Sequence, residues 1–140
     1  AKEQVSIRLP ERAFVHNLIT GETLGETDLV NTSVVVGGAL VLGMSRSRGS
    51  IAVSGPASAH PGEAVRLIMK LSGSGKHLVQ CHWFAPDGSL MPWYAQNVLL
   101  EGSVGSVIFP SALNDNPGRY RAKLTDVLSG ASASLEFTMK

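Results

Sequence analysis

The amino-acid sequence predicts an all-β chain, an immunoglobulin-like antiparallel β-sandwich preceded by a small four-stranded β segment. Three observations lead to this prediction. Apolar and polar residues alternate with a period of two along most of the chain, and no long window shows the 3.6-residue apolar period of a helix. Turn residues separate these alternating runs at short intervals. The 15 glycines and a charged fraction of only 16% also fit short strands joined by tight turns.

Length and charge exclude several classes of protein. A chain of 140 residues has room for one domain, or for one domain and a smaller companion. The 12 basic residues are scattered and the formal net charge is +1, whereas a nucleic-acid binder usually carries a clustered basic face. The longest apolar stretch, residues 34–44, is too short for a membrane helix and contains three glycines. We therefore expect neither a nucleic-acid partner nor a membrane partner.

Residues 50–140 carry the pattern of the sandwich. The clearest alternation lies in residues 119–124 and 131–139, which we predict to form a hairpin across the turn 126–130. Shorter alternating runs predict further strands, at 51–53, 65–71, 79–83 and 107–109. About seven short strands between regularly spaced turns are typical of a two-sheet sandwich.

Residues 1–46 predict a separate hairpin-rich segment. Strands are expected at 5–9, before Pro10, and at 13–19, with a tight turn and return over 20–25. A second hairpin is expected to pair residues 34–36 with residues 39–42 across Gly37 and Gly38. The polar stretch 45–50 is the expected boundary, so the predicted domains are 1–46 and 50–140.

A small sheet of this kind has one apolar face that something must cover. The cover could come from the sandwich, from a second copy of the chain in a homo-oligomer formed through residues 1–46, or from a module upstream. We expect an exposed apolar patch around residues 34–42 or 13–19, marking that contact.

Two stretches resemble known families. The run His16-Asn17-Leu18-Ile19-Thr20-Gly21-Glu22-Thr23-Leu24-Gly25-Glu26-Thr27-Asp28, followed by residues 34–43, is similar to the β-rich tail that closes many large bacterial glycoside hydrolases. Residues 112–120 and 125–130, with Pro86-Asp87-Gly88 upstream, resemble the immunoglobulin-like accessory domains that follow such hydrolases. The order of the two stretches along the chain strengthens both resemblances.

The resemblance implies a non-catalytic C-terminal accessory fragment of a bacterial enzyme of carbohydrate metabolism. Residues 1–46 would then be the tail of an upstream β-module, and the partner would be the upstream catalytic module of the parent chain. It also favours an extracellular, periplasmic or cell-surface location. Two alternatives stay open, a carbohydrate-binding module that uses loop aromatics and an immunoglobulin-like unit of a cell-surface adhesin.

Several residues are expected to have structural roles in the sandwich. Asp115 and Gly118 belong to a turn, and Tyr120 follows at the start of a strand, where a sandwich places its tyrosine corner. Trp83 lies on the third predicted strand, where such folds bury a tryptophan. Cys81 is the single cysteine, and the disulfide of antibody domains is absent. Leu67 and Ala122 stand roughly where the two cysteines of that disulfide would be.

The sequence offers no convincing catalytic, metal or cofactor site. Most of the carboxylates lie in predicted turns, not as a pair in a cleft. The four histidines are widely spaced and lack the spacing of metal-ligand pairs. Residues 114–116 offer oxygen ligands that would suit Ca²⁺, but an Asx turn ahead of Pro117 explains them better. We therefore expect the fragment not to be an enzyme.

Three aromatic residues are candidates for sugar contact. Trp93 and Tyr94 stand side by side in a predicted loop or edge strand, and Phe84 lies on the polar side of its strand. Flat aromatic faces can stack on sugar rings, so these residues could bind carbohydrate. The alternative is that Trp93 and Tyr94 plug the end of the sandwich or face a neighbouring module, as aromatics of small sandwiches mostly do.

Overall fold

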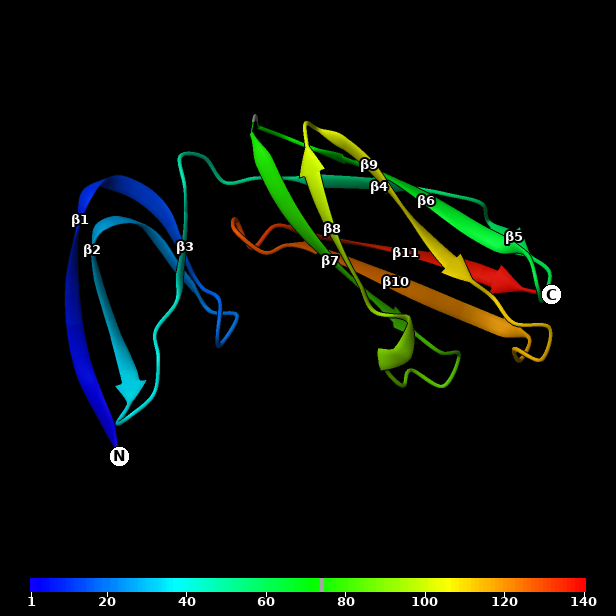
Figure 1. Cartoon of the computed structure of the whole chain (residues 1–140), viewed down its shortest axis with the longest axis horizontal. Helices are drawn as coiled ribbons and strands as arrows, with labels where there is room; N and C mark the ends of the chain where they lie inside the picture. The colour runs from blue at the N-terminus through cyan, green and yellow to red at the C-terminus, as the bar shows by residue number, and fades with distance from the viewer. Residues whose placement is uncertain (74) are drawn as a thin grey trace. The chain divides into compact units, whose positions relative to one another are not determined.

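The computed structural model describes residues 1–73 and 75–140 (Figure 1). Within these residues nearly all regular structure is strand, and the sole helical element is the 3₁₀ turn η1 (Pro92–Tyr94). No helix in the described part of the chain is long and apolar enough to cross a membrane. The predicted all-β fold class is confirmed. The chain divides into two compact units, Ala1–Gly49 with Val127–Gly130, and Ser50–Asp126 with Ala131–Lys140.

The first unit holds a three-stranded antiparallel sheet in the order β2-β1-β3. Its strands are β1 (Lys2–Asn17), β2 (Thr23–Val35) and β3 (Leu42–Ser45). The sequence predicted four strands because Pro10 was taken to end the first of them. Instead β1 continues through Pro10, and its pairing with β2 shifts register between Arg8 and Ala13. Proline has no N–H to donate to a ladder, so a bulge accommodates it where a strand break was expected.

The expected hairpin across Gly37 and Gly38 does not form. Gly37 has a positive φ of 78°, and Gly38 N donates to Val35 O at 2.7 Å, so a turn is present. The chain that leaves this turn does not pair with β2. It reaches the other edge of β1, where Asn17 pairs with Leu42 and Phe14 with Ser45. The backbone groups on that edge of β1 find their hydrogen-bond partners in β3.

The core of the first unit is small. Only Leu9, Val15 and Val30 form its buried apolar cluster, with Ile7, Leu24 and Leu42 partly buried against it. Leu9 and Val15 lie on β1 and Val30 lies on β2, so the long hairpin supplies all three. A cluster of this size leaves much of the apolar surface of the unit in contact with solvent.

The second unit is the immunoglobulin-like sandwich. One sheet has the order β5-β11-β10-β7-β8 and the other has the order β4-β6-β9 (Figure 1). The strands are β4 (Ile51–Ser54), β5 (Ser58–Ala59), β6 (Ala64–Leu71), β7 (Lys76–Phe84), β8 (Gln96–Glu101), β9 (Val104–Pro110), β10 (Gly118–Asp126) and β11 (Ser132–Met139). All pairings are antiparallel except the short one between β5 and β11. The two sheets face each other across a shared core.

Every strand predicted in this part of the chain is present, including the hairpin of β10 and β11. Two strands were missed. β5 has only two residues, which is too short for a periodic signal. β8 was missed because two leucines stand side by side in it: Leu100 is buried and Leu99 is 64% exposed, so the sequence shows no alternation of apolar and polar residues there. Ile68, which interrupts the apolar alternation of β6, is exposed, whereas Val65, Leu67, Met69 and Leu71 of that strand are buried.

Aromatic rings fill the centre of the sandwich. The Phe109 ring lies 5.0 Å from Trp83, 5.5 Å from Tyr120 and 5.6 Å from Phe137, measured between centroids. Tyr120 and Phe137 are stacked with an interplanar angle of 16°. Leu67 and Ala122 are completely buried in the same core.

Candidate functional sites

Tyr120 has the geometry of a tyrosine corner. Its ring is buried, and its hydroxyl donates to the carbonyl oxygen of Asn116 at 2.9 Å. Burial raises the pKa of Tyr120, and the negative charge of Asp115 adds to the effect. The hydroxyl therefore stays protonated at neutral pH and can donate this bond. This hydrogen bond ties the start of strand β10 back to the loop that precedes it.

The loop before β10 is held by Asp115. Its Oδ2 accepts from Ala112 N at 2.7 Å, and its own N–H donates to Ala112 O at 3.1 Å. The carboxylate accepts from a residue three positions earlier, so this bond differs from the Asx turn expected for residues 114–116, in which the side chain bonds the backbone two residues on. Gly118 has a φ of 144°, and a Cβ there would lie 2.7 Å from Pro86 Cγ, so no larger residue fits without rearrangement. Nowhere in the described residues do three His, Cys, Asp or Glu side chains gather to hold a metal ion.

A shallow pocket of about 340 Å³ opens beside this loop, entirely within the second unit. We call it the Trp93 pocket. Its lining comes from three segments: the turn after β7, η1, and the loop before β10. Trp93 is 72% exposed, and the polar lining includes Asp87, Asn114 and Asn116.

The three sugar-contact candidates do not form one surface. The Tyr94 ring is partly buried and packs on Phe109 at 4.8 Å, so it closes the end of the core. It is tilted by 57° from the Trp93 ring, so the two do not make a continuous flat face. Phe84 lies half-buried beneath the Arg121 guanidinium, at 4.2 Å, and is not among the residues lining the pocket. Of the three candidates, Trp93 presents the open ring.

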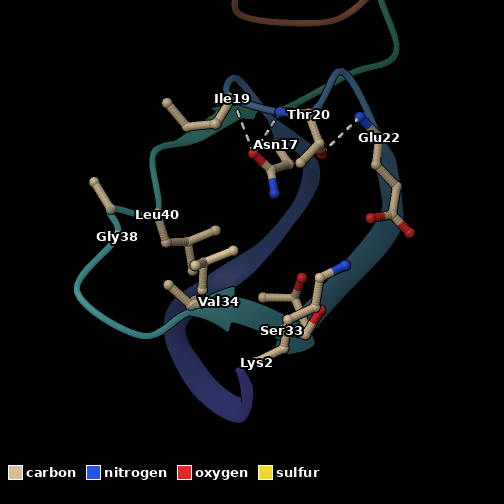
Figure 2. A pocket seen from close by; sticks show the side chains of 12 residues that line it. Lys2, Asn17, Ile19, Thr20, Glu22, Ser33, Val34, Gly38 and Leu40 are labelled. Atoms are coloured by element: carbon tan, nitrogen blue, oxygen red, sulfur yellow. Dashed lines mark hydrogen bonds between the residues drawn. The ribbon is translucent and has the colours of Figure 1, made fainter.

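A second hollow lies in the first unit (Figure 2). It also measures about 340 Å³, and we call it the β2–β3 groove. Apolar lining comes from Ile19, Val34, Val35 and Leu40, and polar lining includes Asn17. The buried Asn17 side chain organises the turn after β1, because its Oδ1 accepts from Ile19 N at 2.9 Å and from Thr20 N at 3.2 Å. This local bonding explains the Asn-Leu-x-Thr-Gly run of the sequence.

The buried Cys81 thiol and the nearly buried His77–Asp126 pair are further titratable groups of the sandwich. Burial raises the pKa of Cys81 to about 12, so the thiol is protonated and unreactive at neutral pH. His77 Nδ1 and Asp126 Oδ2 lie 3.0 Å apart with both side chains nearly buried. Sequence reasoning missed this pair, because its members are 49 residues apart and no motif links them.

Three of the solved structures that resemble this chain all have low sequence identity to it. No protein-family model matches the chain, and no curated protein sequence matches it. The CARDB domain of a Pyrococcus furiosus protein, solved in complex with di-metal ions, is 13% identical, with a TM-score of 0.44, over 66% of this chain and 87% of that one. The PKD domain of an M14-like peptidase from a Thermoplasmatales archaeon is 20% identical, with a TM-score of 0.34, over 64% of this chain and 92% of that one. A Bacteroides uniformis β-glucuronidase is 11% identical, with a TM-score of 0.42, over 99% of this chain and 26% of that one.

Proposed function

We propose that this chain is a non-catalytic accessory region of a larger bacterial glycoside hydrolase, and that its first unit packs against the catalytic module. The observation that carries the proposal is the exposed apolar surface around the β2–β3 groove. Large apolar side chains there are open to solvent, with Ile19 63% exposed and Val36 58% exposed. Val35, within the groove, and Val41, beside Leu40, are also exposed.

The buried cluster of the first unit cannot account for these residues. It contains three buried side chains, whereas the exposed apolar residues around the groove are at least as many. Exposed large apolar side chains gathered around one groove are typical of a contact with another protein. Packing it against a catalytic module would remove it from water and stabilise the parent polypeptide.

The groove also offers a directional contact. Asn17 is buried at its base, and its amide nitrogen points into the hollow (Figure 2). A partner segment that inserts an apolar side chain between Ile19 and Leu40 could place a backbone carbonyl against this amide. Such a hydrogen bond would fix the register of the contact, while the apolar residues would supply most of the affinity.

The positions of the carboxylates support a non-catalytic role. Asp87 accepts from Ser89 and Asp115 from Ala112, so both organise turns. Glu101 and Glu136 form exposed ion pairs with Lys76 and Arg119 across neighbouring strands. These contacts give four of the carboxylates a structural role, whereas glycosidic cleavage needs two acids facing each other across a cleft.

The experiment places a charge in the proposed contact. Val36→Lys, made in the isolated chain, should change the free energy of unfolding by no more than about 0.5 kcal/mol, because the side chain is exposed. The same substitution in the parent polypeptide should weaken packing by at least about 2 kcal/mol, seen as a lower melting temperature of the catalytic module. Leu99→Lys, at an equally exposed site on β8, is the matched control and should change neither.

Three results would contradict the proposal. Equal effects of Val36→Lys and Leu99→Lys in the parent polypeptide would show that the groove is not the contact. Self-association of the chain that Val36→Lys abolishes would assign the groove to a second copy. Turnover of aryl glycosides by the purified chain, abolished by one Asp or Glu substitution, would make the chain an enzyme.

A further inference from the structure

The Trp93 pocket has the features of a ligand site that is separate from the proposed docking surface. All of its lining belongs to the second unit, whereas the β2–β3 groove belongs to the first. Its volume of about 340 Å³ falls at the lower end of the roughly 300–1,000 Å³ range of small-molecule pockets. A small ligand is therefore the occupant to consider.

Trp93 is held on a rigid turn although its ring is open to solvent. Within η1, Tyr94 N donates to Met91 O at 3.1 Å and Ala95 N donates to Pro92 O at 3.2 Å. Met91 is itself buried, and its N–H donates to Trp83 O on β7 at 2.8 Å. These bonds fix the backbone of η1, so a ligand that stacks on the Trp93 ring does not have to order the turn that carries it.

The polar lining can bind hydroxyl groups. Asp87 Oδ1 accepts from Ser89 N at 2.9 Å and from Ser89 Oγ at 2.6 Å, which fixes the carboxylate and leaves its second oxygen for a ligand. The hydrogen bond from the Ser89 hydroxyl lowers the pKa of Asp87, so this group is ionised at neutral pH. Asn114 is exposed in the facing loop, and its amide can both donate and accept.

The charge of the lining restricts the ligand further. Asp87 and Asp115 both contribute to the pocket, and its described lining residues include no Lys or Arg. An anionic ligand would meet two carboxylates without a compensating cation. A neutral polyol avoids this repulsion, and its hydroxyls can donate to the Asp87 carboxylate in charge-assisted hydrogen bonds.

We propose that the Trp93 pocket binds a neutral pyranoside. One face of a pyranose ring carries C–H groups of slightly positive character, which complement the negative face of the Trp93 indole. The hydroxyls at the ring edge then reach Asp87 on one side and Asn114 on the other. The site uses no residue of the β2–β3 groove, so it would add substrate contact to the accessory region without altering the docking of that region.

The two tryptophans make a direct test possible. Trp93 is in the pocket, and Trp83 is completely buried in the core, so its indole N–H is an internal reference. Titrations followed by ¹H–¹⁵N correlation spectra would use methyl glucoside, cellobiose and xylobiose as neutral probes, with glucuronate as the anionic comparison. The expected result is a saturable shift of the Trp93 indole and of Asn114 with at least one neutral probe, no shift of Trp83, and weaker binding of glucuronate.

Three substitutions distinguish stacking of the ligand on Trp93 from nonspecific changes in binding. Trp93→Ala should weaken binding of the neutral probe by about tenfold or more, equivalent to about 1.4 kcal/mol. Asp87→Asn keeps an oxygen for the Ser89 bonds but removes the charge, and it should also weaken binding. Leu99→Ala removes another exposed apolar side chain that is not in the lining, and it should leave binding unchanged.

The proposal is overturned if none of the three neutral probes gives a saturable shift at high millimolar concentration. It is also overturned if glucuronate binds as tightly as the neutral probes, or if Trp93→Ala binds them as tightly as the unchanged chain. Any of these results leaves the docking proposal standing, because the experiment alters no residue of the first unit.

Discussion

Tyr120→Ala is expected to lower the free energy of unfolding of the second unit by about 3–5 kcal/mol, as large aromatic truncations in cores do. The side chain is buried and stacked on Phe137, and its ring lies 5.5 Å from Phe109. Its removal would open a cavity beside two other rings and release the loop that its hydroxyl holds. Chemical denaturation followed by tryptophan fluorescence measures this, because both tryptophans lie in the second unit.

Tyr120→Phe separates the hydrogen bond from the packing. The ring stays, the bond to Asn116 O is lost, and the expected cost is about 1 kcal/mol. If Tyr120→Phe unfolds at the same denaturant concentration as the unchanged chain, the hydroxyl does not stabilise the corner. If Tyr120→Ala costs no more than Tyr120→Phe, the ring does not have the packing role described here.

Phe109→Ala is expected to have an effect of similar size, about 3–5 kcal/mol. Phe109 is completely buried, and its ring lies within 6 Å of four other aromatic rings. It lies on β9 in the smaller sheet, while Trp83, Tyr120 and Phe137 lie on the larger sheet. The substitution would therefore remove the central contact between the two layers of the sandwich.

Phe84→Ala is the matched control for this substitution. Phe84 is only half-buried, and the Arg121 guanidinium lies over its ring at 4.2 Å from the centroid. A partly exposed cation–π contact contributes about 0.5–1 kcal/mol, so Phe84→Ala should cost much less than Phe109→Ala. Equal losses for the two variants in the same denaturation experiment would show that the inter-sheet ring cluster does not dominate the core.

The sandwich was largely predictable because its strands carry their burial pattern in the sequence. Along β6 and β10 the inward side chains are apolar, except Asp126 at the end of β10, and most outward ones are polar, so a period of two is visible without the structure. β8 was less visible because its outward residue Leu99 is also apolar. There the alternation exists in the exposure of the side chains but not in their chemistry.

The first unit was harder to predict because its pairing is not local. The two glycines at 37 and 38 do mark a turn, but the choice of the next partner depends on which sheet edge is unpaired. That edge belongs to β1, more than twenty residues earlier in the sequence than β3. Turn chemistry alone could not decide between β1 and β2 as the partner.

The candidate sites were predictable where their residues are close in the sequence, and not where the fold brings distant segments together. The Tyr120 hydrogen bond spans four residues, so the turn and the strand start indicated it directly. The Trp93 pocket joins the turn after β7 to the loop before β10, and only the fold brings these segments together. Trp93 is exposed and Tyr94 packs on Phe109, and both lie on the η1 turn, which the sequence did not reveal as helical.

Hydrogen exchange measured by mass spectrometry, on the isolated chain and on the same chain within its parent polypeptide, tests the accessory role most directly. We expect slower exchange in the parent polypeptide for residues 17–22 and 34–42, which border the β2–β3 groove. Exchange of β11, in the five-stranded sheet of the sandwich, should be the same in both samples. Identical exchange of the groove segments in the two samples would contradict the docking of this region on a catalytic module.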